Sequence, residues 1–227
     1  MMANIMIPDV ALVDNTEQRT PLVLVLDASG SMTGKPIDEL NRGIRLLEEE
    51  LKKDVIASKR VRLLIIQLGG MDECRIVQDW CDAMDFTAPV LEASGTTPMG
   101  QSVNLALREI ESEKQRFKEA GIPYTRPWLF LMSDGEPTDL WQDAARNCRN
   151  AEADHKVAVF PIMVEGASAE VMGSFSNNGT HAVKMLNGLK FRELFLWLSA
   201  SMQVVSQSTP GGLAQLPSTD SWANVPV

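Results

Sequence analysis

The sequence of 227 residues contains few cysteines and histidines, and this scarcity argues against several kinds of site. The three cysteines, Cys74, Cys81 and Cys148, are odd in number and follow no metal-binding spacing, and the chain has only two histidines. Cysteine and histidine are the usual ligands of zinc in proteins, so a zinc site of that kind is not expected. We expect the three thiols to be reduced and partly buried.

A leader sequence and long apolar runs are also missing. The first fifteen residues carry no basic region and are interrupted by Pro8 and Asp9, which argues against a signal peptide. The longest apolar stretch, around residues 194–205, is too short to span a bilayer. These features predict a cytoplasmic protein that is not embedded in a membrane.

Basic residues are scarce relative to acidic ones, 21 against 30, and the formal net charge is -9. This balance argues against general affinity for nucleic acid or for an anionic membrane, and it suits a cation or a basic partner. The remaining composition, 44% hydrophobic and 22% charged, is ordinary for a globular protein. A chain of this length can form one α/β domain with a sizeable core.

Short apolar runs alternate with amphipathic segments along most of the chain. The run at 22–26 is unbroken and rich in Val and Leu, as in a strand that is buried on both faces of a parallel sheet. Helices are indicated where apolar residues recur at steps of three and four, over 36–52, 103–121, 140–151 and 191–202. Strands are predicted at 22–26, 61–68, 74–80, 128–132, 157–164 and 181–185.

This alternation predicts right-handed crossovers and a doubly wound α/β fold with helices on both faces of the sheet. The sheet should be six-stranded and mostly parallel, with residues 74–80 as one antiparallel edge strand. Pro161 interrupts the fifth strand, which predicts a bulge or an exposed edge at that point.

The composition changes at Ser206, where Ser, Thr, Pro and Gly become frequent and Lys and Arg disappear. We therefore divide the chain into a domain at 1–205, with its core at about 20–205, and a C-terminal tail at 206–227. Such a tail is expected to be flexible unless Trp222 and its neighbours dock on a surface.

Polar side chains follow the first predicted strand at once. Asp27, Ser29 and Ser31 are separated by single residues, and Gly30 lets the loop turn tightly enough for their oxygens to converge. In an open α/β sheet, ligands bind at the carboxyl ends of the strands. Carboxylate and hydroxyl oxygens are hard donors, which favour Mg²⁺ or Mn²⁺.

Two further loops carry matching donors. Thr96 and Thr97 precede the predicted helix that begins near Gln101, and Asp134 follows the strand at 128–132. Each loop alone is an unspecific pattern, but three polar loops at the same edge of a sheet can supply five or six oxygens to one ion. The sequence therefore predicts a divalent-cation site.

Together these loops resemble the metal-ion-dependent adhesion site of von Willebrand factor A domains, and the resemblance covers roughly residues 20–205. In that family two serines and a threonine bind the metal directly, and two aspartates act largely through water. The resemblance therefore implies that Ser29, Ser31 and Thr97 are direct ligands, with Asp27 and Asp134 behind them.

The resemblance has two further implications. Thr97 is preferred to Thr96 because it immediately precedes the Pro-Met-Gly turn, where the family's threonine usually lies. Neutral hydroxyls leave much of the metal charge uncompensated, so a partner protein can supply a carboxylate to an open position. The site is then expected to serve in cation-bridged docking, without catalysis.

Within this family the motifs are similar to those of TerY-like proteins of bacterial tellurium-resistance and stress-response systems. Such proteins are encoded near a protein kinase and a metal-dependent phosphatase, and they are regarded as scaffolds or phosphorylation targets. The motifs are Asp-Ala-Ser-Gly-Ser-Met at 27–32, Gly-Lys-Pro-Ile at 34–37, Gly-Thr-Thr-Pro-Met-Gly at 95–100 and Ser-Asp-Gly-Glu-Pro-Thr-Asp at 133–139.

Several enzymes share part of this pattern. The stretch at 29–36 superficially resembles a phosphate-binding loop, but it lacks the first glycine and has Pro36 where Ser or Thr should bind magnesium. A haloacid-dehalogenase-like phosphatase needs an acid at the position of Ser29. A Ser-His-Asp hydrolase needs a histidine, yet His155 precedes the fifth strand at its amino end and His181 has no evident serine partner.

A non-enzymatic, metal-dependent interaction module is thus the first hypothesis. A metal-dependent phosphohydrolase that uses the same ion, and a phospho-accepting substrate of a neighbouring kinase, stay open as alternatives. Lys35, Glu136 and Thr138 lie near the predicted site, and helix initiation and turn chemistry explain them better than partner choice does.

Overall fold

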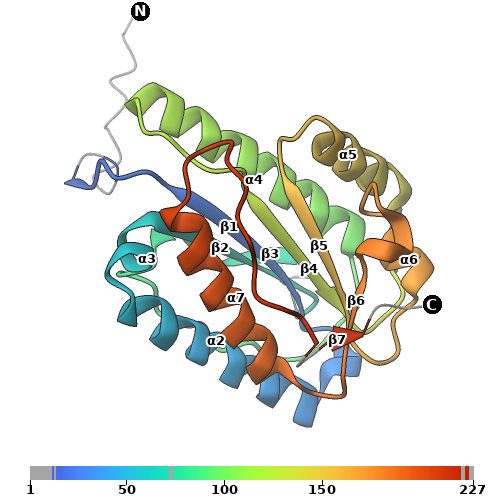
Figure 1. Ribbon diagram of the computed structural model, residues 1–227. Helices are drawn as coiled ribbons and strands as arrows, with labels where there is room; N and C mark the ends of the chain where they lie inside the picture. Colours follow the sequence, from blue (N-terminus) through green and yellow to red (C-terminus); the bar gives the residue numbers. More distant parts are fainter. Residues whose placement is uncertain (1–11, 13, 72–73, 221–222, 225–227) are drawn as a thin grey trace, which may run out of the picture.

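The computed structural model describes residues 12, 14–71, 74–220 and 223–224, which form one sheet with helices on both faces (Figure 1). The strand order is β3-β2-β1-β4-β5-β6-β7. The inner strands pair in parallel, whereas β3 and β7 are antiparallel to their neighbours at the two edges. The strands are β1 (Thr20–Asp27), β2 (Val61–Leu68), β3 (Cys74–Asp82), β4 (Trp128–Ser133), β5 (Ala158–Met163), β6 (Lys184–Leu186) and β7 (Ala223–Asn224).

The two faces of the sheet hold separate apolar cores. Leu22, Leu24 and Leu26 of β1 belong to one core and Val23 and Val25 to the other, because successive side chains of a strand point to opposite faces. Helices α2, α3 and α7 cover the first core, and α4, α5 and α6 cover the second (Figure 1). Their bounds are α2 (Lys35–Lys53), α3 (Val55–Arg60), α4 (Met99–Ala120), α5 (Gln142–Ala153), α6 (Ala169–Gly173) and α7 (Phe191–Gln207).

Most of the predicted elements are confirmed, including the antiparallel edge strand β3. Pairing between β5 and β6 begins only at Ile162. On the side of β5 that faces β6, Pro161 therefore has no residue of a neighbouring strand paired with it. Because Pro161 is itself buried, this unpaired stretch is not the solvent-exposed edge that was one of the two arrangements expected. Among the helices built from described residues, none is long and apolar enough to cross a membrane.

Two predicted boundaries are wrong. The sixth strand begins at Lys184, and His181 lies instead in a 3₁₀ turn, η2 (Gly179–Ala182). Leu140 does not belong to the apolar stripe of α5, because the helix begins at Gln142 and Leu140 is 90% exposed. The preceding Asp139 accepts hydrogen bonds from the start of α4, which keeps this segment in a loop. Short α3 and α6 were not predicted, since five or six residues carry little periodic signal.

The described part of the C-terminal tail docks on the domain. It leaves α7, runs back past β4 and β5, and adds the two-residue strand β7 beside β6 (Figure 1). Ala214 and Leu216 pack against the core beneath α7, and the Trp197 indole Nε1 donates a hydrogen bond to the Pro217 carbonyl at 2.8 Å. The predicted anchor, Trp222, lies outside the described residues. The division of the chain at 205/206 stays a prediction, since α7 itself continues to Gln207.

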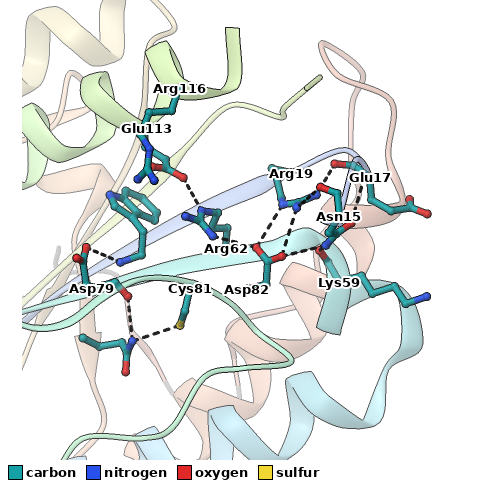
Figure 2. Close-up of polar contacts among 12 residues, drawn as sticks. Asn15, Glu17, Arg19, Lys59, Arg62, Asp79, Cys81, Asp82, Glu113 and Arg116 are labelled. Carbon is teal, nitrogen blue, oxygen red and sulfur yellow. Dashed lines mark hydrogen bonds and ion pairs between the residues drawn. The ribbon is translucent and has the colours of Figure 1, made fainter. Parts of the chain in front are cut away.

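A buried ionic network joins the amino ends of β1 and β2 to the end of β3 and to α4 (Figure 2). Arg62 lies between Glu113, to which its Nε donates, and Asp82, whose Oδ1 is 3.3 Å from its Nη1. Arg19 also pairs with Asp82, with an Nη2–Oδ2 distance of 3.3 Å. All four side chains are at most 3% exposed, so each charge depends on its partners for compensation.

Candidate metal site

Three loops converge at the carboxyl edge of the sheet, as predicted. The loop after β1 is bound to the loop before α4 by two backbone hydrogen bonds, from Gly30 N to Gly95 O at 3.1 Å and from Ser94 N to Ala28 O at 2.9 Å. The turn after β2 joins them through Gly70 N, which donates to Ser94 O at 2.7 Å. Backbone contacts therefore fix the loops relative to one another independently of any bound ion.

The predicted donors Ser29, Ser31 and Asp134 form a continuous chain of contacts. The two serine hydroxyls lie 3.0 Å apart, and Ser31 Oγ donates to Asp134 Oδ1 at 2.7 Å. Ser29 is buried at 2% exposure, whereas Ser31 is exposed and Asp134 is half-buried. The oxygens of β1's loop and β4's loop thus meet at one point that solvent can reach.

Asp27 lies behind these hydroxyls and is fully buried. Its Oδ1 accepts a hydrogen bond from Ser29 N at 2.8 Å, and its Oδ2 accepts one from Ser133 Oγ. Burial raises the pKa of Asp27, and the hydrogen bonds from Ser133 and Ser29 oppose that shift. The carboxylate therefore orients the loop that carries the two serines.

The structure places the two candidate threonines differently. Thr97 is 6% exposed, whereas its neighbour Thr96 is exposed. The Thr97 hydroxyl faces the loop of Asp134, because a Cβ placed on Gly135 would lie only 3.4 Å from Thr97 Oγ1. This position beside the other donors favours Thr97 as the ligand.

Three residues that support the donors were not singled out as such from the sequence. Ser133 donates a hydrogen bond to Asp27. Thr138 contacts both the backbone N–H and the backbone carbonyl of Thr97: Thr97 N donates to Thr138 Oγ1 at 3.1 Å, and Thr138 N donates to Thr97 O at 2.9 Å. Asp139 accepts from Gly100 N and Gln101 N at 3.0 and 2.8 Å, which caps the start of α4. Their only sequence signal is polarity close to Asp134. The contacts of Thr138 support the prediction that it stabilises the local turn rather than determining the choice of partner.

Two glycines are required by the close approach of loops around the donors. Gly69 has a φ of +88°, and a Cβ at this position would lie 2.6 Å from Ser29 N. Gly166 has a φ of +108°, and a Cβ there would lie 2.8 Å from Asp134 O. Both the left-handed backbone and the missing space exclude larger residues.

The donor set is made of oxygens. In the part of the chain that the structure describes, no three His, Cys, Asp or Glu side chains gather to hold a metal, so a site rich in nitrogen or sulfur ligands is absent there. Hydroxyl and carboxylate oxygens fit a hard divalent cation. His155 precedes β5 at its amino end, as expected, and His181 lies in η2, which precedes β6.

The chain belongs to the von Willebrand factor type A domain family, whose model matches residues 22–195. Domains of this family are typically protein-interaction modules with a site for a divalent metal. The chain is 25% identical over 206 residues to the uncharacterized protein sll0103 of Synechocystis sp., a match that spans 83% of this chain and 44% of that protein.

Solved structures share the fold. The pilus adhesin SpaC of Lactobacillus rhamnosus GG gives a TM-score of 0.65 at 12% identity, over 84% of this chain and 32% of that one. The ArnB paralog VWA2 of Sulfolobus acidocaldarius gives 0.54 at 16% identity, over 82% and 46%. Proximal thread matrix protein 1 of the mussel byssus, solved with a zinc-occupied adhesion-site motif, gives 0.52 at 13% identity, over 83% and 48%. The chain thus spans less than half the length of each of these proteins.

Proposed function

We propose that this chain is a non-enzymatic protein-interaction module that binds a partner's acidic group through a divalent cation. The observation that carries the proposal is the continuous contact from Ser29 through Ser31 to Asp134, with the buried Thr97 beside it. Ser31 and Asp134 are 103 residues apart in the sequence, yet their side-chain oxygens are in contact at an accessible point.

Each donor has a distinct proposed role. The hydroxyls of Ser29, Ser31 and Thr97 bind the ion directly, and Asp27 and Asp134 act largely through water. Neutral direct ligands leave much of the ion's charge uncompensated, so a carboxylate from a partner protein is attracted to an open position. We propose Mg²⁺ or Mn²⁺ as the ion, since the donors are hard oxygens.

Metal titration tests the donor set, with two adjacent threonines as a matched pair. Calorimetry of the wild type should detect one Mg²⁺ or Mn²⁺ per chain, and Asp27→Ala should abolish that binding while circular dichroism stays native. Thr97→Ala should weaken binding by about tenfold or more, roughly 1.4 kcal/mol, because a direct ligand is lost. Thr96→Ala should leave the affinity unchanged. Equal weakening by both threonine variants would contradict the assignment.

Partner capture tests the bridging role. A protein that binds the wild type in Mg²⁺ should be released by a chelator and should not bind Thr97→Ala, whereas Thr96→Ala should retain it. Capture that persists undiminished in chelator would rule out a cation bridge. Hydrolysis of an aryl phosphate or a phosphoprotein, lost in Asp27→Ala, would instead favour the metal-dependent phosphohydrolase.

We further propose a cytoplasmic role in a bacterial tellurite-resistance or stress-response system with a kinase and a phosphatase. The support is the similarity of the four loop motifs to those of TerY-like proteins. The genes beside this one test the setting, since a kinase and phosphatase pair is expected there. Mass analysis after co-expression with that kinase tests whether the chain is itself a phospho-acceptor.

A further inference from the structure

A second candidate site lies at the opposite edge of the sheet from the metal site. A cavity of about 830 Å³ opens at the amino ends of β4 and β5, and the C-terminal tail forms one of its walls. Its volume falls within the range of small-molecule binding sites. None of the five predicted metal donors lines it.

One part of the cavity wall is apolar and aromatic. Trp128 and Phe160, from β4 and β5, have ring centroids 4.4 Å apart, and Val205 and the tail residue Leu216 add aliphatic surface. Trp128 is 6% exposed and Phe160 is half-buried. This surface suits the apolar body of a ligand.

The other part of the wall is basic, although the whole chain carries a net charge of -9. Lys114, Arg126, His155 and Lys156 line the cavity, and its described lining contains no Asp or Glu. Lys114 and Lys156 each contact an acid outside the lining, at 2.8 Å. Among these basic residues of the lining, Arg126 is therefore the one whose charge matters most for binding a ligand.

The Arg126 guanidinium has only neutral partners among the residues that the structure describes. Its Nε donates to Val157 O at 2.8 Å and its Nη2 donates to Glu152 O at 2.9 Å, and both acceptors are backbone carbonyls. The Arg126 side chain is half-buried. The two carbonyl oxygens orient the guanidinium, but as neutral acceptors they do not neutralise its charge. In the same wall the Thr125 hydroxyl is buried, with the residue 4% exposed, and it has no hydrogen-bond partner among the described residues.

We propose that this cavity binds a small amphipathic carboxylate. Its carboxylate pairs with Arg126, with Lys156 nearby, and its apolar body lies on Trp128 and Phe160 beneath the tail. An oriented guanidinium that lacks a carboxylate and an adjoining apolar surface are together what such a ligand requires.

Decanoate at submicellar concentration is the probe, with decanol as its uncharged counterpart. Calorimetry of the full chain should show saturable decanoate binding, a raised unfolding temperature, and at least tenfold weaker binding of decanol. Arg126→Gln should weaken decanoate binding by about tenfold or more and leave decanol binding unchanged. Arg146→Gln is the matched control, since Arg146 is exposed on α5 and pairs with Asp143.

Lys156→Gln provides a second variant if Arg126→Gln does not fold, because Lys156 is exposed. It should weaken decanoate binding and spare decanol binding. Three results would overturn the proposal: decanol binds as tightly as decanoate, folded variants bind decanoate like the wild type, or binding occurs only at micelles or anionic vesicles.

Discussion

At the scale of single residues, burial determines how each reactive side chain behaves. Asp27 is fully buried and serves its neighbours as a hydrogen-bond acceptor, while Ser31 remains exposed and able to reach an ion. The same contrast applies to the three thiols, which are free: Cys74 and Cys81 are half-buried, whereas Cys148 lies on the buried face of α5. The expectation of free thiols is thus confirmed among the described residues.

Burial raises the pKa of Cys81 to about 11 and that of Cys148 to about 12, and it also raises that of Cys74. At pH 8 only about one Cys148 in ten thousand is then a thiolate, the form that reacts. We expect iodoacetamide to label Cys74 first and Cys148 only after unfolding, as mass spectrometry of peptides can show. In denaturant all three should react alike. Native labelling of Cys148 as fast as Cys74 would contradict this order.

The same shift has a consequence for stability at high pH. A thiol whose folded pKa is raised holds its proton longer in the folded state than in the unfolded state. Its contribution to stability is therefore complete below about pH 9 and declines as the pH rises from there toward 12. The free energy of unfolding should fall in that window and fall less in Cys148→Ala.

At the scale of elements, helix α4 connects the metal site to the rest of the fold. Asp139 caps its first turn from the loop after β4, and Thr138 of the same loop holds the Thr97 backbone just before the helix. The start of α4 and the loop of Asp134 are thus fastened to each other. Neither Asp139 nor Thr138 is a predicted metal donor.

We therefore expect Asp139→Ala to affect both stability and metal binding. Loss of the cap should lower the free energy of unfolding by about 1 kcal/mol, within the range of 0.5–2 for such caps. Mg²⁺ affinity should also fall, because Thr97 is held less firmly. Asp143→Ala is the control, since Asp143 is 78% exposed in the first turn of α5. Unchanged Mg²⁺ affinity in a destabilised Asp139→Ala would show that the cap does not position the donor.

At the scale of the whole molecule, the two edges of the sheet have different chemistry. The carboxyl edge carries loops with hydroxyl and carboxylate oxygens, and the amino edge carries the buried ionic network of Arg19, Arg62, Asp82 and Glu113 together with the basic cavity. The C-terminal tail crosses the face between α7 and β5, where an aromatic cluster that includes Trp128, Phe160 and Trp197 lies beneath it.

Removal of residues 209–227 should destabilise the domain, because apolar surface under the tail becomes exposed. We expect a loss of about 1–3 kcal/mol in chemical denaturation, from buried area and from the hydrogen bond of Trp197 to Pro217. Leu216→Ala should reproduce part of the loss. Leu213→Ala, at a fully exposed position in the same tail, should leave stability unchanged. Equal stability of the truncated and full chains would contradict the docking role of the tail.

Much of the fold was predictable because the relevant signals are local. The central strand at 22–26 is buried on both faces, so it appears in the sequence as an unbroken apolar run, and the helices beside it carry a single apolar stripe. Asp27, Ser29 and Ser31 follow that run directly, so placing the candidate metal site at the carboxyl edge required no tertiary information.

Tertiary contacts decided what local pattern could not. Thr96 and Thr97 have the same side chain, and only packing against the loop at 134–139 buries one and exposes the other. Leu140 fits a helical stripe, but Asp139 is engaged by α4 some forty residues earlier in the chain. The tail has no periodic pattern, and it docks because α7 and β6 leave an aromatic surface and a strand edge unoccupied. Local sequence thus determined the strands, the helices and the donor loops, whereas contacts between distant segments determined the strand order and which side chains those loops present.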